Sequence, residues 1–193
     1  MKAQRELWRK QLGGLDPDHL VFIDESSAKT NLTRLRGRAP KGERIKAHAP
    51  YGRWETTTML CGLRLSGATA PMLLLGAIDG AAFTEYVRQV LAPTLRPGDI
   101  VVMDNLASHQ APGALEAIQA VGASALFLPP YSPDFNPIEM MWSKVKQHLR
   151  SAAARTFDAL CDAMAVALVS VTRSDATGYF NHCGVATEMR NLL

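Results

Sequence analysis

The sequence predicts an α/β fold in which helices flank a mixed central sheet. Short apolar, β-branched runs alternate along the chain with longer stretches whose apolar residues recur every three or four positions. Proline and glycine residues separate these segments, as they do at element boundaries. The chain has 193 residues, 47% of them hydrophobic, so it can bury one proper core. We therefore expect one main domain.

The first part of the chain is expected to contribute three strands and a long loop. Glycines end the first segment, a β-branched run follows, and a polar stretch rich in glycine and proline precedes two further strand-like runs. Long ordered loops in compact domains are usually functional. The expected elements are a short helix or linker over 1–18, a strand over His19–Ile23 that ends at Asp24, a loop over Ser26–Tyr51, and a hairpin of Thr56–Leu65 with Ala70–Leu75.

The second part predicts alternating helices and strands. Apolar residues from Phe83 to Leu91 follow helical spacing, which predicts a helix over Ala81–Leu95. The run Ile100–Met103 is apolar throughout, as in a central strand covered on both faces. The remaining elements are helices over Pro112–Val121, Pro137–Arg150 and Phe157–Val171, and a strand over Ala125–Leu128. This order is that of a ribonuclease H-like fold, which we place at 19–175, followed by an unassigned tail over 176–193.

Three acidic residues are the candidate catalytic groups. Asp24 and Asp104 each follow an apolar strand-like run, and 34 residues separate Asp104 from Glu139 at a helix start. Ligand sites in open α/β sheets gather beyond the carboxyl ends of the strands. Carboxylates are hard ligands that suit Mg²⁺ or Mn²⁺, and two ions roughly 3.5–4 Å apart can catalyse in-line displacement at phosphorus. This pattern predicts phosphoryl transfer on nucleic acid.

Each of these residues also has a structural interpretation. A single aspartate after a strand is usually a turn or cap residue. Asn136, Pro137 and Glu139 fit a helix start with a capping box, which on local grounds makes Glu139 structural. Asp134 competes with Glu139 for the role of third ligand, whereas Glu25 should point to the opposite strand face from Asp24. Asn105, His109 and Asn136 are supporting candidates, although a solvent-exposed histidine is the simpler interpretation of His109.

Basic residues gather in one segment of a chain whose net charge is only +3. Between residues 34 and 53 there are seven basic residues against one acid, a local charge of +6. Such a stripe can contact a phosphate backbone, although a solvated loop is the alternative. The DNA-binding candidates are Arg34, Arg36, Arg38, Lys41, Arg44, Lys46 and Arg53, together with Lys146, which follows Glu139 on the same predicted helix face.

The remaining composition excludes several classes of protein. Three widely spaced cysteines without paired histidines argue against a zinc site or a disulfide framework. The first 14 residues lack the apolar core of a signal peptide, and no apolar run is long enough to cross a bilayer. We expect a cytoplasmic protein, associated with the bacterial nucleoid if it binds DNA.

Four segments together resemble the catalytic domain of mariner-superfamily DDE transposases, in particular the bacterial insertion-sequence branch. They are VFIDESSAKTN, LRGRAPKGERI, VVMDNLASH and LPPYSPDFNPIEMMWSKVK, and the resemblance extends from about Leu20 to Arg150. It implies metal-dependent DNA strand cleavage and strand transfer, as in cut-and-paste transposition and DNA integration. Asp24, Asp104 and Glu139 would be the catalytic metal ligands, and a clamp-like loop would lie within residues 34–53. The implied partners are transposon ends, target DNA and a second copy of the chain.

Two alternatives to an active transposase stay open at this point. One is an inactive DNA-binding or dimerising remnant, and the other is a different ribonuclease H-like nuclease. The resemblance also implies helix-turn-helix modules ahead of the catalytic domain, yet only about twenty residues precede Val21. We therefore expect a catalytic domain alone. A split reading frame with a separate helix-turn-helix polypeptide as partner, and a truncated copy that has lost these modules, both stay open.

Overall fold

A five-stranded mixed sheet forms the centre of the protein. The computed structural model describes residues 2–34, 36–46, 50–51 and 55–185. The strands stand in the order β3-β2-β1-β4-β5. The first three pair antiparallel, whereas β1, β4 and β5 are parallel. Their bounds are β1 Leu20–Lys29, β2 Thr56–Arg64, β3 Gly67–Leu75, β4 Ile100–Met103 and β5 Ser124–Phe127. The predicted α/β class and ribonuclease H-like fold are confirmed.

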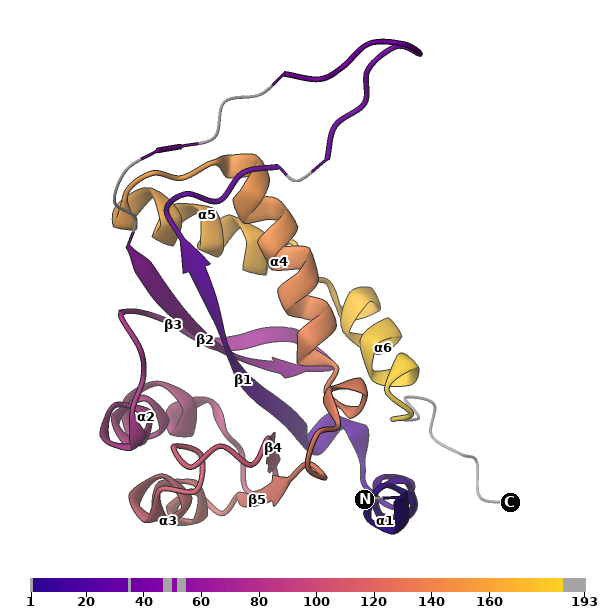
Figure 1. Ribbon diagram of the computed structural model, residues 1–193. Helices are drawn as coiled ribbons and strands as arrows, with labels where there is room; N and C mark the ends of the chain where they lie inside the picture. Colours follow the sequence, from indigo (N-terminus) through magenta and orange to yellow (C-terminus); the bar gives the residue numbers. More distant parts are fainter. Residues whose placement is uncertain (1, 35, 47–49, 52–54, 186–193) are drawn as a thin grey trace.

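Helices cover both faces of the sheet (Figure 1). Alternate side chains of β1 point to opposite faces, so Leu20 and Phe22 enter one apolar cluster and Val21 and Ile23 enter another. The first cluster is closed by α4 Ile138–Ala152, α5 Phe157–Val169 and α6 Arg173–His182, and the second by α2 Gly80–Tyr86 and α3 Pro112–Ala120. The helix α2 continues into a π-helical turn over Val87–Leu91 and a 3₁₀ turn over Ala92–Thr94.

Strand β1 is longer than the sequence predicts. The expectation that it ends at Asp24 is wrong, because the strand runs on to Lys29. Its polar second half pairs with β2 alone, up to Lys29 opposite Thr56, whereas its pairing with β4 ends at Phe22. A search for apolar runs misses this half of the strand because most of its residues are polar. Among the described strands, no parallel neighbour lies beside it to bury them. Asp24 therefore lies within β1, one side of which is open beyond the end of β4.

The segments before and after the expected domain pack on the same core. Helix α1 Lys2–Leu12 buries Trp8 and Leu12 in the cluster that includes α4, α5 and α6. Helix α6 crosses the expected boundary between residues 175 and 176. It places Phe180 edge-to-face against Phe22 of β1, with 5.2 Å between the ring centroids. Both terminal helices thus contribute to the hydrophobic core.

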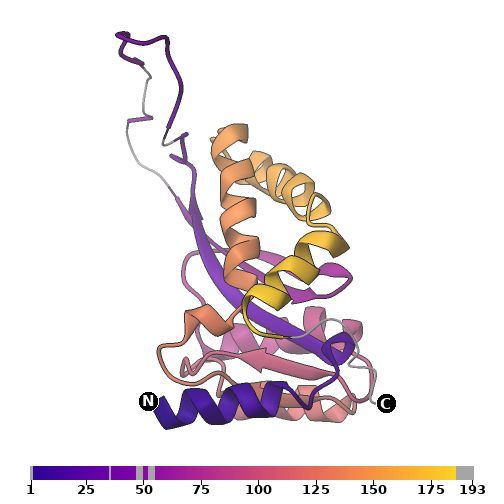
Figure 2. The same ribbon diagram turned by 90° about the vertical axis from the view of Figure 1, so that its right-hand side faces the viewer.

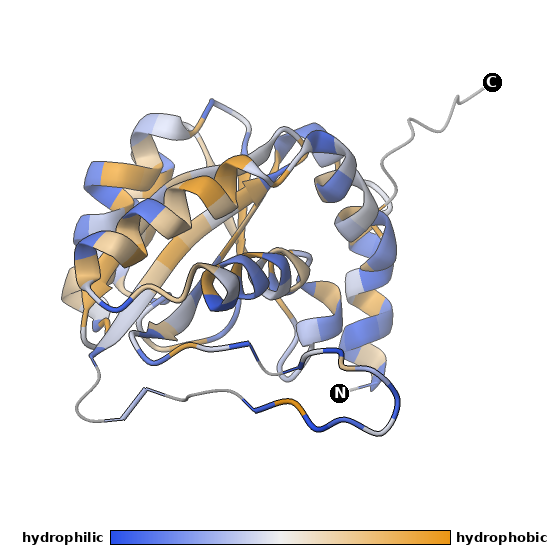
Figure 3. Ribbon diagram, turned by 90° about the horizontal axis from the view of Figure 1, so that it is seen from above, coloured by the Kyte–Doolittle hydropathy of each residue, from blue (hydrophilic) through white to orange (hydrophobic). Residues whose placement is uncertain are grey.

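A long loop projects from the sheet between β1 and β2, as expected (Figures 1 and 2). Its described residues are mostly exposed and form no helix or strand. Figure 3 shows that most of its length is hydrophilic. At its base, the Arg155 guanidinium donates hydrogen bonds to the carbonyls of Thr30 and Leu32, at 3.0 and 2.9 Å. The loop therefore begins from a fixed anchor beside α4 and α5.

The three cysteines are free thiols, as expected. Burial raises the pKa of Cys61 to about 12, so its thiol stays protonated and inert. Among the described residues, none of the helices is both long and apolar enough to span a membrane.

Candidate active site

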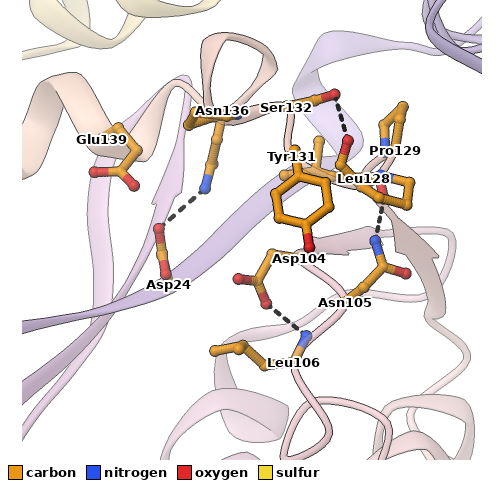
Figure 4. A pocket seen from close by; sticks show the side chains of 12 residues that line it. Asp24, Asp104, Asn105, Leu106, Leu128, Pro129, Tyr131, Ser132, Asn136 and Glu139 are labelled. Carbon is orange, nitrogen blue, oxygen red and sulfur yellow. Dashed lines mark hydrogen bonds between the residues drawn. The ribbon is translucent and has the colours of Figure 1, made fainter. Parts of the chain in front are cut away.

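Sheet register brings Asp24 and Asp104 together. The parallel strands β1 and β4 pair Leu20 with Ile100 and Phe22 with Val102. Continuing this register by two residues places Asp24 beside Asp104, just beyond the end of β4. Both line a pocket of about 440 Å³ that Glu139 also lines (Figure 4). The structure thus brings the three predicted carboxylates into one pocket at the carboxyl edge of the parallel strands.

Asp24 is the most buried of the three carboxylates, with 8% of its surface exposed. Its Oδ1 accepts a hydrogen bond from the backbone N–H of Glu25 at 2.8 Å, and its Oδ2 accepts one from Asn136 Nδ2 at 3.0 Å. Burial and then the nearby charge of Glu139 raise the pKa of Asp24 to about 7. An ionised carboxylate at this position therefore needs a cation beside it.

Helix α4 presents Glu139 in its first turn, but the predicted capping box is wrong. Pro137 occupies the N-cap position and makes no side-chain capping bond, and the Asn136 side chain turns instead to Asp24. The local pattern allowed Asn136 either to cap the helix through its Oδ1 or to donate from its Nδ2 to a distant acceptor. In the folded chain, the Nδ2 group donates to the buried Asp24 carboxylate. Glu139 is consequently exposed and unrestrained by a cap. Figure 4 shows Glu139 and Asn136 on the same side of the pocket as Asp24.

Asp104 is held by His109, which is fully buried and not solvent-exposed as the sequence suggested. The Nδ1 atom of His109 lies 2.6 Å from Asp104 Oδ1, and its Nε2 lies 2.8 Å from Glu25 Oε2. Burial alone would lower the pKa of His109, but these carboxylates outweigh it and raise the pKa to about 9. A charged imidazolium therefore bridges Asp104 and Glu25.

The role of Glu25 follows from its strand position. It points to the opposite face from Asp24, as predicted, and there it meets His109, whose ring packs 4.5 Å from that of Phe83. Asp104 also accepts a hydrogen bond from the backbone N–H of Leu106 at 3.0 Å. Burial raises the pKa of Asp104, but His109 and the Leu106 N–H outweigh it and leave the pKa below its usual value. Asp104 is thus ionised and fixed in orientation.

Asn105 positions the neighbouring loop. Its Nδ2 donates a hydrogen bond to the carbonyl of Leu128, the residue that begins the proline-rich segment leading to Glu139. Figure 4 shows this bond on the far side of the pocket from Asp24. Asn105 therefore ties the segment after β4 to the segment after β5.

Helix α1 fixes the loop that delivers Asn136 and Glu139. The Arg5 guanidinium donates to Ser132 Oγ at 2.8 Å and to both carboxylate oxygens of Asp134, at 2.9 and 2.5 Å. It also lies 4.3 Å from the ring centroid of Phe135. Asp134, the competitor for the third ligand, is thus paired with Arg5 and does not line the pocket. No pattern in the sequence indicates this contact, because its partners are more than 120 residues apart.

Replacing Arg5 by Ala is expected to weaken catalysis without unfolding the protein. The loop would lose its bidentate anchor, and misplacing a catalytic group by about 1 Å can cost roughly 10²-fold in rate. We expect a loss of roughly 10- to 100-fold in cleavage rate with increased proteolysis between residues 128 and 136. Lys10→Ala, on the same helix, is the matched control. Equal rates for Arg5→Ala and Lys10→Ala would show that the anchor is dispensable.

The donor set fits a hard divalent cation. Carboxylate and amide oxygens surround the pocket, and Asn136 Oδ1 is buried without a hydrogen-bond partner among the described residues. Within the same part of the chain, no three carboxylate, imidazole or thiol side chains already stand close enough to enclose an ion. The exposed Glu139 would have to move toward Asp24 and Asp104 to complete a metal site.

A basic groove lies farther along α4. Arg34 and Arg36, from the loop after β1, line a hollow of about 680 Å³ with Gln147 and Arg150 of α4. The predicted DNA-binding residue Lys146 lines a smaller hollow that also includes Glu139 and Arg150. Arg38, Lys41, Arg44 and Lys46 are exposed on the projecting loop, whereas Arg53 lies outside the described residues. Basic side chains thus extend from Glu139 to the loop.

The chain is similar in fold to solved structures of the Mos1 mariner transposase. The pre-cleavage Mos1 transpososome gives a TM-score of 0.76 at 14% identity, covering 95% of this chain and 58% of that chain. The Mos1 paired-end complex with Mn gives 0.71 at 17%, covering 95% and 58%. The catalytic domain of Mos1 transposase alone gives 0.69 at 14%, covering 95% and 86%. This chain therefore spans little more than half of the longer Mos1 chains.

Sequence comparison identifies the family. None of the curated proteins matches the chain. The model of the family described as "DDE superfamily endonuclease" matches residues 19–161, which is most of the chain and includes all three pocket carboxylates. The protein belongs to the DDE superfamily of endonucleases.

Proposed function

We propose that this chain is the catalytic domain of a transposase that cleaves and rejoins DNA strands with divalent metal ions, and that Asp24, Asp104 and Glu139 are its metal ligands. The observation that carries the proposal is the pocket itself. Elements far apart in sequence bring three carboxylates together at the carboxyl end of β4, beside the middle of β1. Burial and the charge of Glu139 raise the pKa of Asp24, as expected where a cation is required.

The side chains have separable roles in this proposal. Asp24 and Asp104 would hold Mg²⁺ or Mn²⁺, with Glu139 as the third ligand. The chemistry supplied by two bound ions is activation of the attacking oxygen and neutralisation of charge on the leaving oxygen. Asn136 orients Asp24 through its hydrogen bond, and His109 orients Asp104. The solved Mos1 paired-end complexes with Mn and with Mg support this choice of metals.

A nicking assay tests the proposal. The purified chain, incubated with supercoiled plasmid and Mg²⁺ or Mn²⁺, is expected to produce nicked or linear DNA, and a chelator should stop the reaction. Parallel incubation with an RNA–DNA hybrid separates this function from that of another ribonuclease H-like nuclease. Preferred cleavage of the hybrid would contradict the transposase assignment, and metal-independent cleavage would contradict the proposed chemistry.

DNA binding is proposed to use the basic groove and the projecting loop. Charge-reversing Arg36, Arg38 and Arg44 together should flatten the salt dependence of DNA affinity, because each neutralised phosphate contributes a slope of about 0.9 in log affinity against log salt. The measurement is the dissociation constant for one duplex at several salt concentrations. Reversal of Lys2, Lys10 and Arg173, which are exposed away from the groove, is the matched control. Equal slopes for both triple variants would remove the loop from the DNA interface.

Assembly on DNA is part of the same proposal. The active complex is proposed to contain two copies of the chain bound to transposon ends and target DNA. Solved structures of Mos1 include a pre-cleavage transpososome and a strand transfer complex. Selection of particular DNA ends is assigned to a helix-turn-helix region, separate or fused. The basic groove of this chain would contact duplexes mainly through their phosphates.

A further inference from the structure

The pocket also has an apolar wall, which provides no ligand for a metal ion or a phosphate. Its apolar lining consists of Leu128, Pro129, Pro130 and Tyr131 across the pocket from Asp24 and Glu139, and of Leu106 beside Asp104. Leu106, Pro130 and Tyr131 are exposed to solvent, Leu106 at 44% and Tyr131 at 92%. Figure 4 shows the Tyr131 ring and Pro129 across the pocket from Asp24 and Glu139. The site therefore offers an aromatic surface beside its carboxylates.

The backbone holds Tyr131 in an unfavourable conformation. Its φ of 53° lies in the left-handed region, which a bulky aromatic residue rarely adopts. Such conformations persist only where the surrounding structure imposes them, and they gather at functional sites. Here Pro129 and Pro130 precede the residue, and Ser132 Oγ donates to the Pro130 carbonyl at 3.2 Å. Arg5 in turn donates to that hydroxyl, so the turn is fixed from both sides.

Packing of the side chain does not explain why a tyrosine occupies this turn. Tyr131 is almost fully exposed, and among the described residues no hydrogen bond or ring pair involves it. A left-handed glycine or asparagine would make the same turn more easily. The aromatic ring thus packs little against the rest of the protein and is accessible to a ligand with a flat, apolar face.

We propose that Tyr131 stacks on an unstacked nucleobase beside the scissile phosphate. This inference rests on the proposed function and adds a contact to it. A phosphate bound at Asp24 and Asp104 would lie in the pocket that Tyr131 also lines, so a base of the same strand would be within reach of the exposed ring. Base–aromatic stacking tolerates any base because each has a π face. Tyr131 would therefore hold the base without reading its sequence.

A double-mutant cycle between protein and DNA tests the proposal. Cuts made by the wild-type chain in one end-labelled duplex are first mapped, and one strong cut is chosen. Cleavage rates at that cut are then measured for the wild-type chain and for Tyr131→Ala, on the intact duplex and on duplexes with one abasic site at each flanking position. Loss of a base–aromatic stack predicts roughly a 10-fold slower rate for Tyr131→Ala on the intact duplex. At one abasic position the two rates should agree within about twofold, because the stacking partner is already absent.

Three further variants separate stacking from structural effects. Tyr131→Phe should cleave within about twofold of the wild type, since stacking needs the ring and not the hydroxyl. Tyr131→Gly should be as slow as Tyr131→Ala while its thermal midpoint stays at or above that of the wild type, because glycine favours the left-handed backbone. Val169→Ala, which truncates an exposed apolar side chain on α5, should show no coupling to any base.

The outcomes distinguish this inference from the proposed function. A Tyr131→Ala deficit that is unchanged at every abasic position overturns the stacking contact, and so does a Tyr131→Phe variant as slow as Tyr131→Ala. In either case normal cleavage by the wild-type chain leaves the proposed function standing. A wild-type chain that fails to cleave the intact duplex overturns the proposed function, and the stacking proposal with it.

Discussion

Replacement of Asp24 or Asp104 by Asn, or of Glu139 by Gln, is expected to reduce DNA strand cleavage by about 10³-fold or more. Each change keeps the side-chain size but removes a charged oxygen ligand, and loss of metal positioning removes several kcal/mol of transition-state stabilisation. The measurement is the rate of metal-dependent plasmid nicking. Glu116→Gln, an exposed change on α3, is the control. A variant of any of the three that nicks at near-normal rate would remove that residue from the site.

Although Asp24→Asn should lose cleavage activity, it should make the metal-free protein more stable. Because burial and Glu139 raise the pKa of Asp24 to about 7 in the folded chain, ionising it destabilises the metal-free protein. The ordinary carboxyl value is about 3.9, so the cost develops as pH rises from near 4 through 7. In a chelator, the thermal midpoint of Asp24→Asn should therefore exceed that of the wild type at pH 8, and the two should converge near pH 4. A lower midpoint at pH 8 would show that the Asp24 charge is already compensated within the chain.

The largest loss of stability is expected from Asp99→Asn. Asp99 is fully buried at the sheet edge opposite the pocket, where its Oδ2 accepts from Arg64 at 2.7 Å and from the backbone N–H of Arg96 at 2.8 Å. Arg64 is itself 8% exposed, so the substitution leaves a buried guanidinium without its counterion. Breaking a buried ion pair costs about 3–5 kcal/mol. Chemical denaturation should show this decrease, whereas Asp162→Asn on the exposed face of α5 should change stability by less than about 0.5 kcal/mol.

The pH dependence of the stability difference between the wild type and Asp99→Asn gives a second test of the ion pair. Burial alone would raise the pKa of Asp99, but Arg64 and the Arg96 N–H outweigh it and leave the pKa below its ordinary value. The stabilisation is therefore fully present above about pH 4 and is lost as pH falls through the lower, folded value. The gap between wild type and Asp99→Asn should narrow below pH 4. A gap that stays constant down to pH 2 would mean that the ion pair does not provide the stability.

Long-range features were predictable where the sequence pattern reflects the sheet. Apolar runs ahead of Asp24 and Asp104 indicated two strands that bring these carboxylates together, although β1 continues past Asp24, and strand alternation placed Glu25 on the other face. Local patterns were insufficient where a side chain can bond either to its neighbours in the sequence or to distant residues. Asn136 fits a helix cap, yet its amide turns to the buried Asp24 carboxylate. Asp99 closes a turn with Arg96, and no local pattern indicates that its side chain also pairs with Arg64, 35 residues away.

Contacts of residues that the sequence suggests to be solvent-exposed could not be predicted either. Nothing in the pattern around His109 shows that its ring is buried between Glu25 and Asp104, because Glu25 lies in β1, far from His109 in the sequence. Likewise, Arg5 looks like an ordinary charge on a terminal helix. Its role depends on α1 packing through Trp8 beside the loop that contains Asp134, which only the folded chain reveals.

The position of the bound metal decides whether Asp24, Asp104 and Glu139 are its ligands. Crystals of the chain grown or soaked with Mn²⁺ can be measured at a wavelength where manganese scatters anomalously. Anomalous peaks are expected between Asp24 and Asp104, at roughly 2.0–2.3 Å from carboxylate oxygens, with Glu139 drawn toward them. Peaks at Asp134 or elsewhere on the surface, with the pocket empty at saturating Mn²⁺, would contradict it.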